Sequence, residues 1–370
     1  MKKIAALKSN FLLLIDRPSD VFFILFSYLI TAFFYFPKLL FINSNSLSSQ
    51  FINRQINEIF FYRDALIYPD KMHEAKSTFR IAVPLIGKLL HLTATGLIYF
   101  QFVIYFLFLF VLYQVLKNTV QSKTETRLLL LAFCFTYVGK SFFNVTPFFD
   151  CYAFLFVLLT FYFKNPLLLF ACSIVCFYTD ERADLAVLFS VLWHSREQLS
   201  QTVNGIKKFI PTINSISIIA GLIFALVLRL FLTQQYQVQV TWSMIGVDAF
   251  LNNKNFIPLG LLMAFEGFWW LVLLSLFTEK KMVAGLNFIL TCLVLLGAFM
   301  VYDLTRSVAY AFPAIFIAIF CVKNELSEIS FQSLAILVLA SCILIPTYSI
   351  INPTVSFLAP FYTTVFDFIK

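Results

Sequence analysis

The sequence predicts an all-α integral membrane protein. Hydrophobic residues make up 61% of the 370 positions and charged residues only 12%, whereas about 25% of an ordinary soluble domain is charged. Apolar runs close to the roughly 20 residues that a spanning helix needs recur along the chain between short polar stretches. We therefore expect a single polytopic domain over residues 1–370 that contacts the lipid bilayer, with no soluble domain inserted.

The alternation of apolar runs and polar breaks predicts about eleven transmembrane or re-entrant helices. The first run is long for a secretory signal and is followed by no small-residue cleavage site, so we interpret it as a retained helix. The expected helices cover residues 20–41, 97–116, 128–140, 147–163, 165–179, 183–194, 212–232, 256–277, 282–301, 307–322 and 330–350.

The expected helices 165–179 and 183–194 are short. Twelve helical residues extend only about 18 Å, against a hydrocarbon core of about 30 Å. The two segments form either two spans or a re-entrant hairpin whose tip, "TDERAD", stops inside the outer leaflet. In both cases Lys164 and Arg196 lie on the same side of the membrane, so the later topology is unchanged.

The distribution of charge favours a cytoplasmic amino terminus. Outside the long segment 42–96, 14 lysines and arginines fall on the assigned inner side and 7 on the outer side, as the positive-inside rule predicts. Twelve of the 19 acidic residues fall on the outer side. We expect a multi-pass protein of the cytoplasmic membrane whose carboxyl terminus lies outside. The net charge of +8 requires no nucleic-acid partner, because cytoplasmic loops commonly carry such an excess.

Residues 42–96 form the first extracytoplasmic loop in this topology. "INEIFFYRDALIYP" places Ile56, Ile59 and Phe60 at helical spacing, and "FRIAVPLIGKLLHL" is a second apolar and basic stretch. Both stretches predict short helices that lie in the membrane interface. Such helices would roof a cavity formed by the ends of the spanning helices.

Charged residues gather at the outer ends of the expected helices. A charge near the membrane interior is costly and is a candidate functional residue, usually with a partner. The alternative is that these residues solvate helix ends at the interface. The candidates are Glu58, Asp64, Arg80, Lys140, Asp150, Asp180, Glu181, Arg182, Asp184, Asp248, Asp303 and Arg306.

Two charges lie deeper in the apolar runs. Glu266 falls midway along "FIPLGLLMAFEGFWWLVLL", and Arg229 lies within "LIFALVLRLFL". We expect them to pair structurally between neighbouring helices. The alternatives are a catalytic role, a lipid-chain groove marked by Glu266 with Gly267, Trp269 and Trp270, or a coupling pair of a transporter.

The layout resembles the GT-C class of polytopic glycosyltransferases, which use a polyprenyl-phosphate-linked sugar as donor. "NEIFFYRDA" at 57–65 resembles the "DE…Y…A" pattern that follows the first helix in that class, and "FRIAVPLIGKLL" resembles its "YRxLxPLL" stretch. "PFFDCYAFLF", "TDERADLAVL" and "YDLTRSVAYAFP" resemble later short motifs. Asn57 stands where the class often has Asp, so Glu58 or Asp64 would supply the essential acid.

The resemblance implies sugar transfer from the lipid-linked donor to a hydroxyl of a glycan or lipid acceptor on the extracytoplasmic face, in cell-envelope assembly. This chemistry needs a carboxylate that accepts the acceptor proton and cations that stabilise the departing phosphate. Arginine suits phosphate because its planar fork binds two oxygens. Glu58 or Asp64 is the expected base, and Arg80, Lys140, Arg182 and Arg306 are the expected phosphate ligands.

The remaining acids have three possible roles under this hypothesis. Asp150, Asp180, Glu181 and Asp303 orient the cations, bind sugar hydroxyls, or hold a divalent metal through oxygen ligands. Of these we do not favour the metal, and we expect no cofactor.

Three other classes compete with the glycosyltransferase. A transporter or flippase for a lipid-linked or anionic substrate usually shows an internal repeat with broken helices, and we find no such repeat. A polysaccharide polymerase or ligase shares lipid-linked substrates, and a non-catalytic assembly subunit shares the fold. The sequence has no P-loop, Rossmann glycine pattern, GxSxG or HExxH motif, so nucleotide-driven and hydrolytic chemistry has no support.

Overall fold

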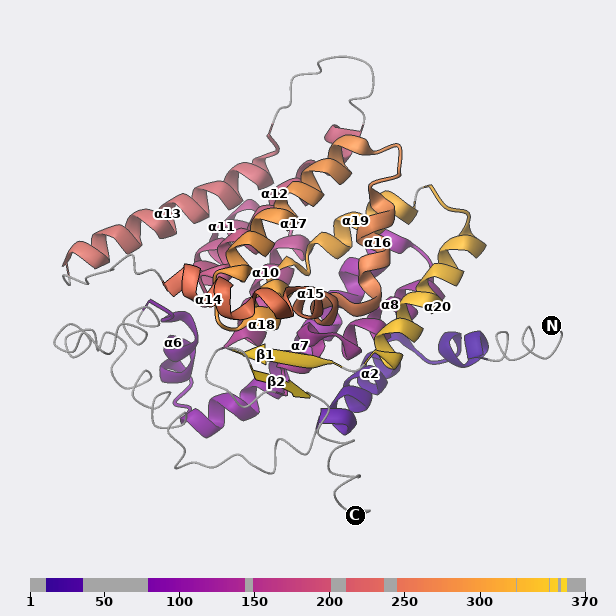
Figure 1. The fold of residues 1–370 in the computed structure, drawn as a ribbon, viewed down its shortest axis with the longest axis horizontal. Coiled ribbons are helices and arrows are strands. Elements are labelled where there is room, and N and C mark those ends of the chain that lie inside the picture. The colour runs from indigo at the N-terminus through magenta and orange to yellow at the C-terminus, as the bar shows by residue number, and fades with distance from the viewer. Residues whose placement is uncertain are drawn as a thin grey trace.

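The computed structural model describes residues 11–35, 79–143, 149–200, 211–235, 245–323, 325–345, 347–351 and 354–357. These residues form a helical bundle with one small β-hairpin (Figure 1). Helix α13 packs against α11 on one flank of the bundle, and α20 packs against α8 on the other (Figure 1). Helix α6 lies at the same end of the bundle as the hairpin.

Helices occur in all eleven ranges where the sequence predicts them. Their bounds are α2 Asp20–Tyr35, α6 Ala82–Leu89, α7 Ala94–Val120, α8 Lys123–Phe135, α9 Tyr137–Ser141, α10 Asp150–Tyr162, α11 Pro166–Phe177, α12 Arg182–Ser200, α13 Ile213–Gln235, α14 Ile245–Asn253, α15 Ile257–Phe265, α16 Trp269–Ser275, α17 Lys281–Phe299, α18 Leu304–Val308, α19 Ala314–Lys323 and α20 Glu328–Leu344. Short 3-10 helices at Lys254–Phe256, Glu266–Phe268 (η4) and Ala309–Ala311 (η5) join neighbouring segments.

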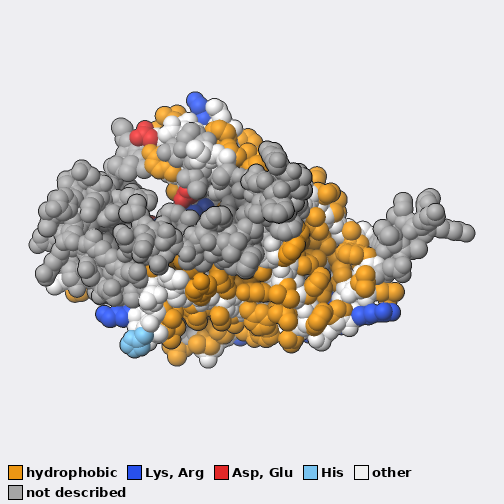
Figure 2. Space-filling model, turned by 90° about the horizontal axis from the view of Figure 1, so that it is seen from below, with side chains coloured by type: hydrophobic (Ala, Val, Ile, Leu, Met, Phe, Trp, Pro, Cys, Tyr) orange, Lys and Arg blue, Asp and Glu red, His pale blue; other side chains and the backbone are white. Residues whose placement is uncertain are grey.

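Several helices have the length and apolar surface of membrane spans. Four segments qualify, Ala94–Val120, Ile213–Gln235, Gly246–Ser275 and Lys281–Phe299, and a fifth qualifies if the bent pair that ends at Lys323 is one span. Large apolar side chains of α13 are exposed, as expected for contact with lipid. Figure 2 shows hydrophobic side chains over much of the described surface of one face, with charged side chains mostly near its margins. The protein is membrane-embedded, and the number of eleven spans remains a prediction.

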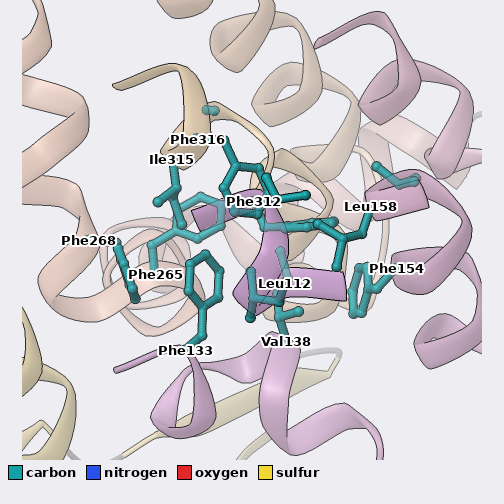
Figure 3. Close-up of a cluster of buried hydrophobic side chains, with 14 of the residues drawn as sticks. Leu112, Phe133, Val138, Phe154, Leu158, Phe265, Phe268, Phe312, Ile315 and Phe316 are labelled. Atoms are coloured by element: carbon teal, nitrogen blue, oxygen red, sulfur yellow. The ribbon is translucent and has the colours of Figure 1, made fainter. Parts of the chain in front are cut away.

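Aromatic side chains from distant segments fill the centre of the bundle (Figure 3). The ring of Phe133 in α8 lies 4.4 Å from that of Phe268 in η4 and 5.7 Å from that of Phe316 in α19, measured between centroids. Gly267 permits the approach of η4 to α20, because a Cβ there would lie 2.5 Å from the carbonyl oxygen of Val338. The core therefore ties the middle of the chain to its last helix.

Three of the expected continuous helices are broken. Thr136 is extended and separates α8 from α9. Glu266 has a positive φ of 49° and separates α15 from α16. The segments on either side of Pro313 are bent by 43°. A hydropathy pattern reports how apolar a segment is but not the direction of its backbone. The sequence therefore predicted continuous helices where the backbone is broken.

The expected helix 330–350 is wrong at its end. Helix α20 stops at Leu344, and β1 (Tyr348–Ile351) pairs antiparallel with β2 (Thr354–Phe357). Ile345 precedes Pro346 and is extended, because a proline disfavours the helical conformation of the residue before it. β-Branched residues in both strands then favour the hairpin. The all-α prediction missed this small sheet.

Residues 42–96, the predicted first extracytoplasmic loop, are described only from Phe79 onward. Helix α6, Ala82–Leu89, occupies the second stretch where the sequence predicts an interfacial helix. The first stretch, with Glu58 and Asp64, lies outside the described residues.

Candidate functional site

Six charged side chains meet where α10 and α12 begin. We call this group the arginine–aspartate cluster. It contains Arg80 before α6, Asp150 at the start of α10, Asp180 in the α11–α12 turn, Arg182 at the start of α12, Asp303 before α18, and Arg306 in α18.

The turn "TDERAD" builds the centre of this cluster. The backbone N–H groups of Thr179 and Asp180 donate to the carbonyl of Cys176 and end α11. The Asp180 carboxylate then accepts the backbone N–H of Arg182 at 3.0 Å, a local bond typical of aspartate in turns. The same carboxylate accepts Nε and Nη2 of Arg182 at 2.8 and 2.7 Å. This two-pronged contact fixes the guanidinium plane.

Arg306 joins the carboxylates of three chain segments. Its Nε lies 2.5 Å from Oδ2 of Asp150, its Nη1 2.9 Å from Oδ2 of Asp303, and its Nη2 3.5 Å from Oδ2 of Asp180. Arg80 adds a contact of 3.3 Å from Nη1 to Oδ2 of Asp180. Asp180 is thus approached by three arginines.

Neutral side chains complete the cluster. The hydroxyl of Tyr310 donates to Oδ1 of Asp150 at 2.8 Å, and its ring lies 4.9 Å from the Arg182 guanidinium carbon. Nη1 of Arg182 donates to the hydroxyl oxygen of Ser307 at 2.9 Å. Sequence reasoning missed Tyr310 and Ser307. The four-residue spacing from Arg306 to Tyr310 places both on one helical face, which could have identified the tyrosine.

The cluster has a buried centre and a partly exposed rim. The side chain of Asp180 is fully buried, whereas those of Arg80, Arg182 and Asp303 are 16 to 18% exposed. Burial by itself raises the pKa of Asp180, but nearby guanidinium groups, led by Arg182 and Arg80, hold that pKa well below its usual range. Three arginines thus face three aspartates, and the rim guanidinium groups are within reach of a ligand.

Glu181 lies beside the cluster in sequence but has a different partner. Its Oε1 lies 2.8 Å from Nη2 of Arg229 in α13. The Arg229 guanidinium also stacks 4.7 Å from the ring of Phe79. The expected pair between Glu266 and Arg229 is therefore wrong, because α13 packs against α11 and not against the segment that carries Glu266.

Lys140, an expected phosphate ligand, pairs with Glu266. Its Nζ lies 3.2 Å from Oε1 of Glu266, and both side chains are almost completely buried. The hydroxyl of Thr347 donates to the same Oε1. A buried lysine held by a carboxylate is not presented to an external ligand, so the structure separates Lys140 from the arginines.

The described part of the chain contains no group of three or more His, Cys, Asp or Glu side chains placed to hold a metal ion. The cluster carboxylates contact arginines, which leaves fewer oxygen ligands for a cation. The expected base residues Glu58 and Asp64 lie outside the described residues.

Comparisons with models of known families, with curated proteins and with solved structures found no match. No residue role therefore comes from a relative. The functional argument rests on the arginine–aspartate cluster and on its position in a membrane-embedded bundle.

Proposed function

We propose that the protein is a membrane glycosyltransferase that moves a sugar from a polyprenyl-phosphate donor to an acceptor hydroxyl on the extracytoplasmic face. The supporting observation is the arginine–aspartate cluster, in which three guanidinium groups from separate chain segments converge between apolar helices. Apolar surface beside a phosphate-binding group suits a donor whose lipid tail stays in the bilayer. The resemblance to the GT-C class points to the same chemistry.

The rim arginines are the proposed phosphate ligands. A donor phosphate would replace part of the carboxylate contacts of Arg80 and Arg182, while buried Asp180 still orients both guanidinium groups. Donors held in place before the reaction stabilise developing charge without reorganisation. Arg306 contacts three carboxylates and is only 7% exposed, so we assign it to holding the cluster together.

The first extracytoplasmic loop is proposed to supply the base. An oxocarbenium-like transition state requires a carboxylate that accepts the proton of the acceptor hydroxyl. Glu58 and Asp64 precede Arg80 in the same loop, so one loop would carry both the base and a phosphate ligand. The cluster carboxylates are engaged by arginines and suit this role less well.

The test is transfer from a defined polyprenyl-phosphate sugar by the full chain in proteoliposomes. Glu58→Gln or Asp64→Asn should lower turnover by about two to four orders of magnitude, as is typical for loss of a general base. Arg80→Gln should chiefly raise the KM for the donor. Arg229→Gln is the matched control, because this arginine lies outside the cluster, and it should leave the KM unchanged.

Two outcomes would contradict the proposal. One is full activity of both amide variants, which removes the first-loop base. The other is that no lipid-linked sugar is consumed. A polymerase or ligase would instead consume preassembled lipid-linked glycans, so the size of the transferred unit distinguishes those reactions.

The buried Lys140–Glu266 pair supports a transporter as the second candidate. Glu266 lies at the break between α15 and α16, inside the segment Gly246–Ser275 that is long enough to span a membrane, and Lys140 reaches it from α9. Broken helices with intramembrane charges are common at transporter coupling sites. Dissipation of a substrate gradient by the native protein, but not by Glu266→Gln, would favour this candidate.

A further inference from the structure

A second polar site lies at the opposite ends of α10 and α12 from the arginine–aspartate cluster. A cavity of about 470 Å³ opens there between α7, α10, α12 and α13. Arg196 follows Arg182 by fourteen positions along α12, which corresponds to a rise of about 21 Å. The polar and aromatic side chains that line this cavity include Asn118, Lys164, Trp193, His194, Arg196 and Asn214.

The cavity carries a net positive charge. Lys164 is exposed in the α10–α11 connection and has no ion-pair partner among the described residues. The guanidinium carbon of Arg196 lies over the ring of Trp193, 3.7 Å from its centroid. Its Nη1 donates to the Trp193 carbonyl at 2.6 Å, and its Nη2 lies 3.6 Å from Oε1 of Glu197. Two cations thus face one acid.

A neutral histidine forms part of the wall. Nε2 of His194 lies 2.9 Å from the carbonyl of Thr160, which only accepts, so this nitrogen carries the proton. Nδ1 then accepts from Nδ2 of Asn214 at 3.3 Å. The histidine positions the Asn214 amide at the cavity, and Asn118 provides a second amide. These groups can bind hydroxyls or ester oxygens.

Apolar surface continues from the cavity along the bundle. Leu167 and Leu168 of α11, which follow Lys164, are 73% and 43% exposed. Phe161 and Trp193 pack against each other with centroids 5.5 Å apart. Tryptophan and tyrosine favour the membrane–water interface. A ligand with a polar head and an apolar tail would match both the polar cavity and the apolar surface of α11.

We propose that this cavity binds the headgroup of an anionic phospholipid whose phosphate diester carries a hydroxylated substituent. Lys164 and Arg196 contact the phosphate, the amides of Asn118 and Asn214 bind the headgroup hydroxyls, and the acyl chains lie along α11. Basic pockets between spanning helices commonly bind anionic lipid headgroups. The site shares no residue with the arginine–aspartate cluster, so the proposal is independent of the glycosyl-transfer reaction.

The experiment measures lipid binding to the purified full chain by native mass spectrometry in detergent. The probes are phosphatidylglycerol, phosphatidylcholine and inorganic phosphate. Phosphatidylglycerol should bind tighter than phosphatidylcholine. Lys164→Gln and Arg196→Gln should each weaken phosphatidylglycerol binding by roughly fivefold, the effect of one basic residue near an anionic lipid.

Lys281→Gln is the matched control, since this lysine is exposed at the start of α17 and lies outside the cavity lining. It should change the affinity less than twofold. Lys164 is exposed and outside the helices, so Lys164→Gln carries the test if Arg196→Gln fails to fold. Unchanged binding by Lys164→Gln, or equal binding of phosphatidylcholine, would overturn the proposal. Inorganic phosphate that binds as tightly as the lipid would instead identify a site for a free anion.

Discussion

The arginine–aspartate cluster and the Lys140–Glu266 pair both hold charged side chains within an apolar helical bundle. They differ in how those charges are compensated. In the cluster, Asp180 is contacted by three arginines, and Arg80 and Arg182 at the rim are partly exposed. In the pair, one cation meets one acid, and both side chains are almost completely buried. Removal of a charged side chain at the rim of the cluster should therefore cost little stability. Removal of either member of the isolated pair leaves the other charge buried and uncompensated.

The largest loss of stability is expected when the carboxylate of Asp180, at the centre of the cluster, is removed. Asp180→Asn leaves three guanidinium groups without their common acceptor, and breaking a buried ion pair from one side costs up to about 5 kcal/mol. The melting temperature in detergent should fall sharply. Asp303→Asn is the control at the rim, because Asp303 contacts Arg306 alone among the cluster arginines, and its loss should be small. Equal effects of both variants would contradict the distinction between centre and rim.

The pH dependence of stability tests the same carboxylate. The pKa of Asp180 is lowered in the folded protein, so the ionised form stabilises the fold at any pH above the unfolded value of about 4. This stabilisation is lost as the pH falls from about 4 toward the lower folded pKa. The stability difference between the native protein and Asp180→Asn should therefore shrink below about pH 4. A constant difference would show that Asp180 is not held ionised.

The second-largest loss of stability is expected when one member of the Lys140–Glu266 pair is removed. Lys140→Met leaves the Glu266 carboxylate buried without its cation, which should cost about 3 kcal/mol of unfolding free energy. The double variant Lys140→Met/Glu266→Gln removes both charges and should recover at least half of that loss, because the two effects are coupled. Additive losses in a denaturation series would show that the pair does not interact.

A smaller effect should follow loss of one hydrogen bond at the cluster. Tyr310→Phe removes the donor to Asp150 but keeps the ring against Arg182. A hydrogen bond to a charged group contributes about 2 kcal/mol. The melting temperature should fall less than in Lys140→Met. A larger fall would show that Tyr310 contributes more to stability than its one hydrogen bond to Asp150.

The smallest effect is expected at the partly exposed pair of Arg229 and Glu181. Their side chains are 21% and 32% exposed, and pairs accessible to solvent contribute about 1 kcal/mol or less. Arg229→Gln should therefore leave the melting temperature almost unchanged. A change as large as that of Lys140→Met would show that the pair is shielded by lipid.

The composition and the apolar runs determined the membrane class and where helices occur, because burial in lipid demands long apolar segments whatever their neighbours are. The sequence also placed the charges of "TDERAD" and "YDLTRS" at the same outer ends of the expected helices, and Arg306 does lie 3.5 Å from Asp180. Charged groups at one membrane depth need compensation, so their meeting was predictable. The roles of these residues in catalysis stay predictions.

Only the tertiary structure decided which charges pair. Lys140 meets Glu266, and Arg229 meets Glu181, because α9 lies against α15, which ends just before Glu266, and α13 lies against α11. The tertiary structure also revealed the backbone break at Glu266, which lies within an uninterrupted apolar run. A hydropathy pattern is local and reports the environment of each segment alone. The choice of neighbours depends on side-chain shapes across the whole bundle, which are distant in sequence.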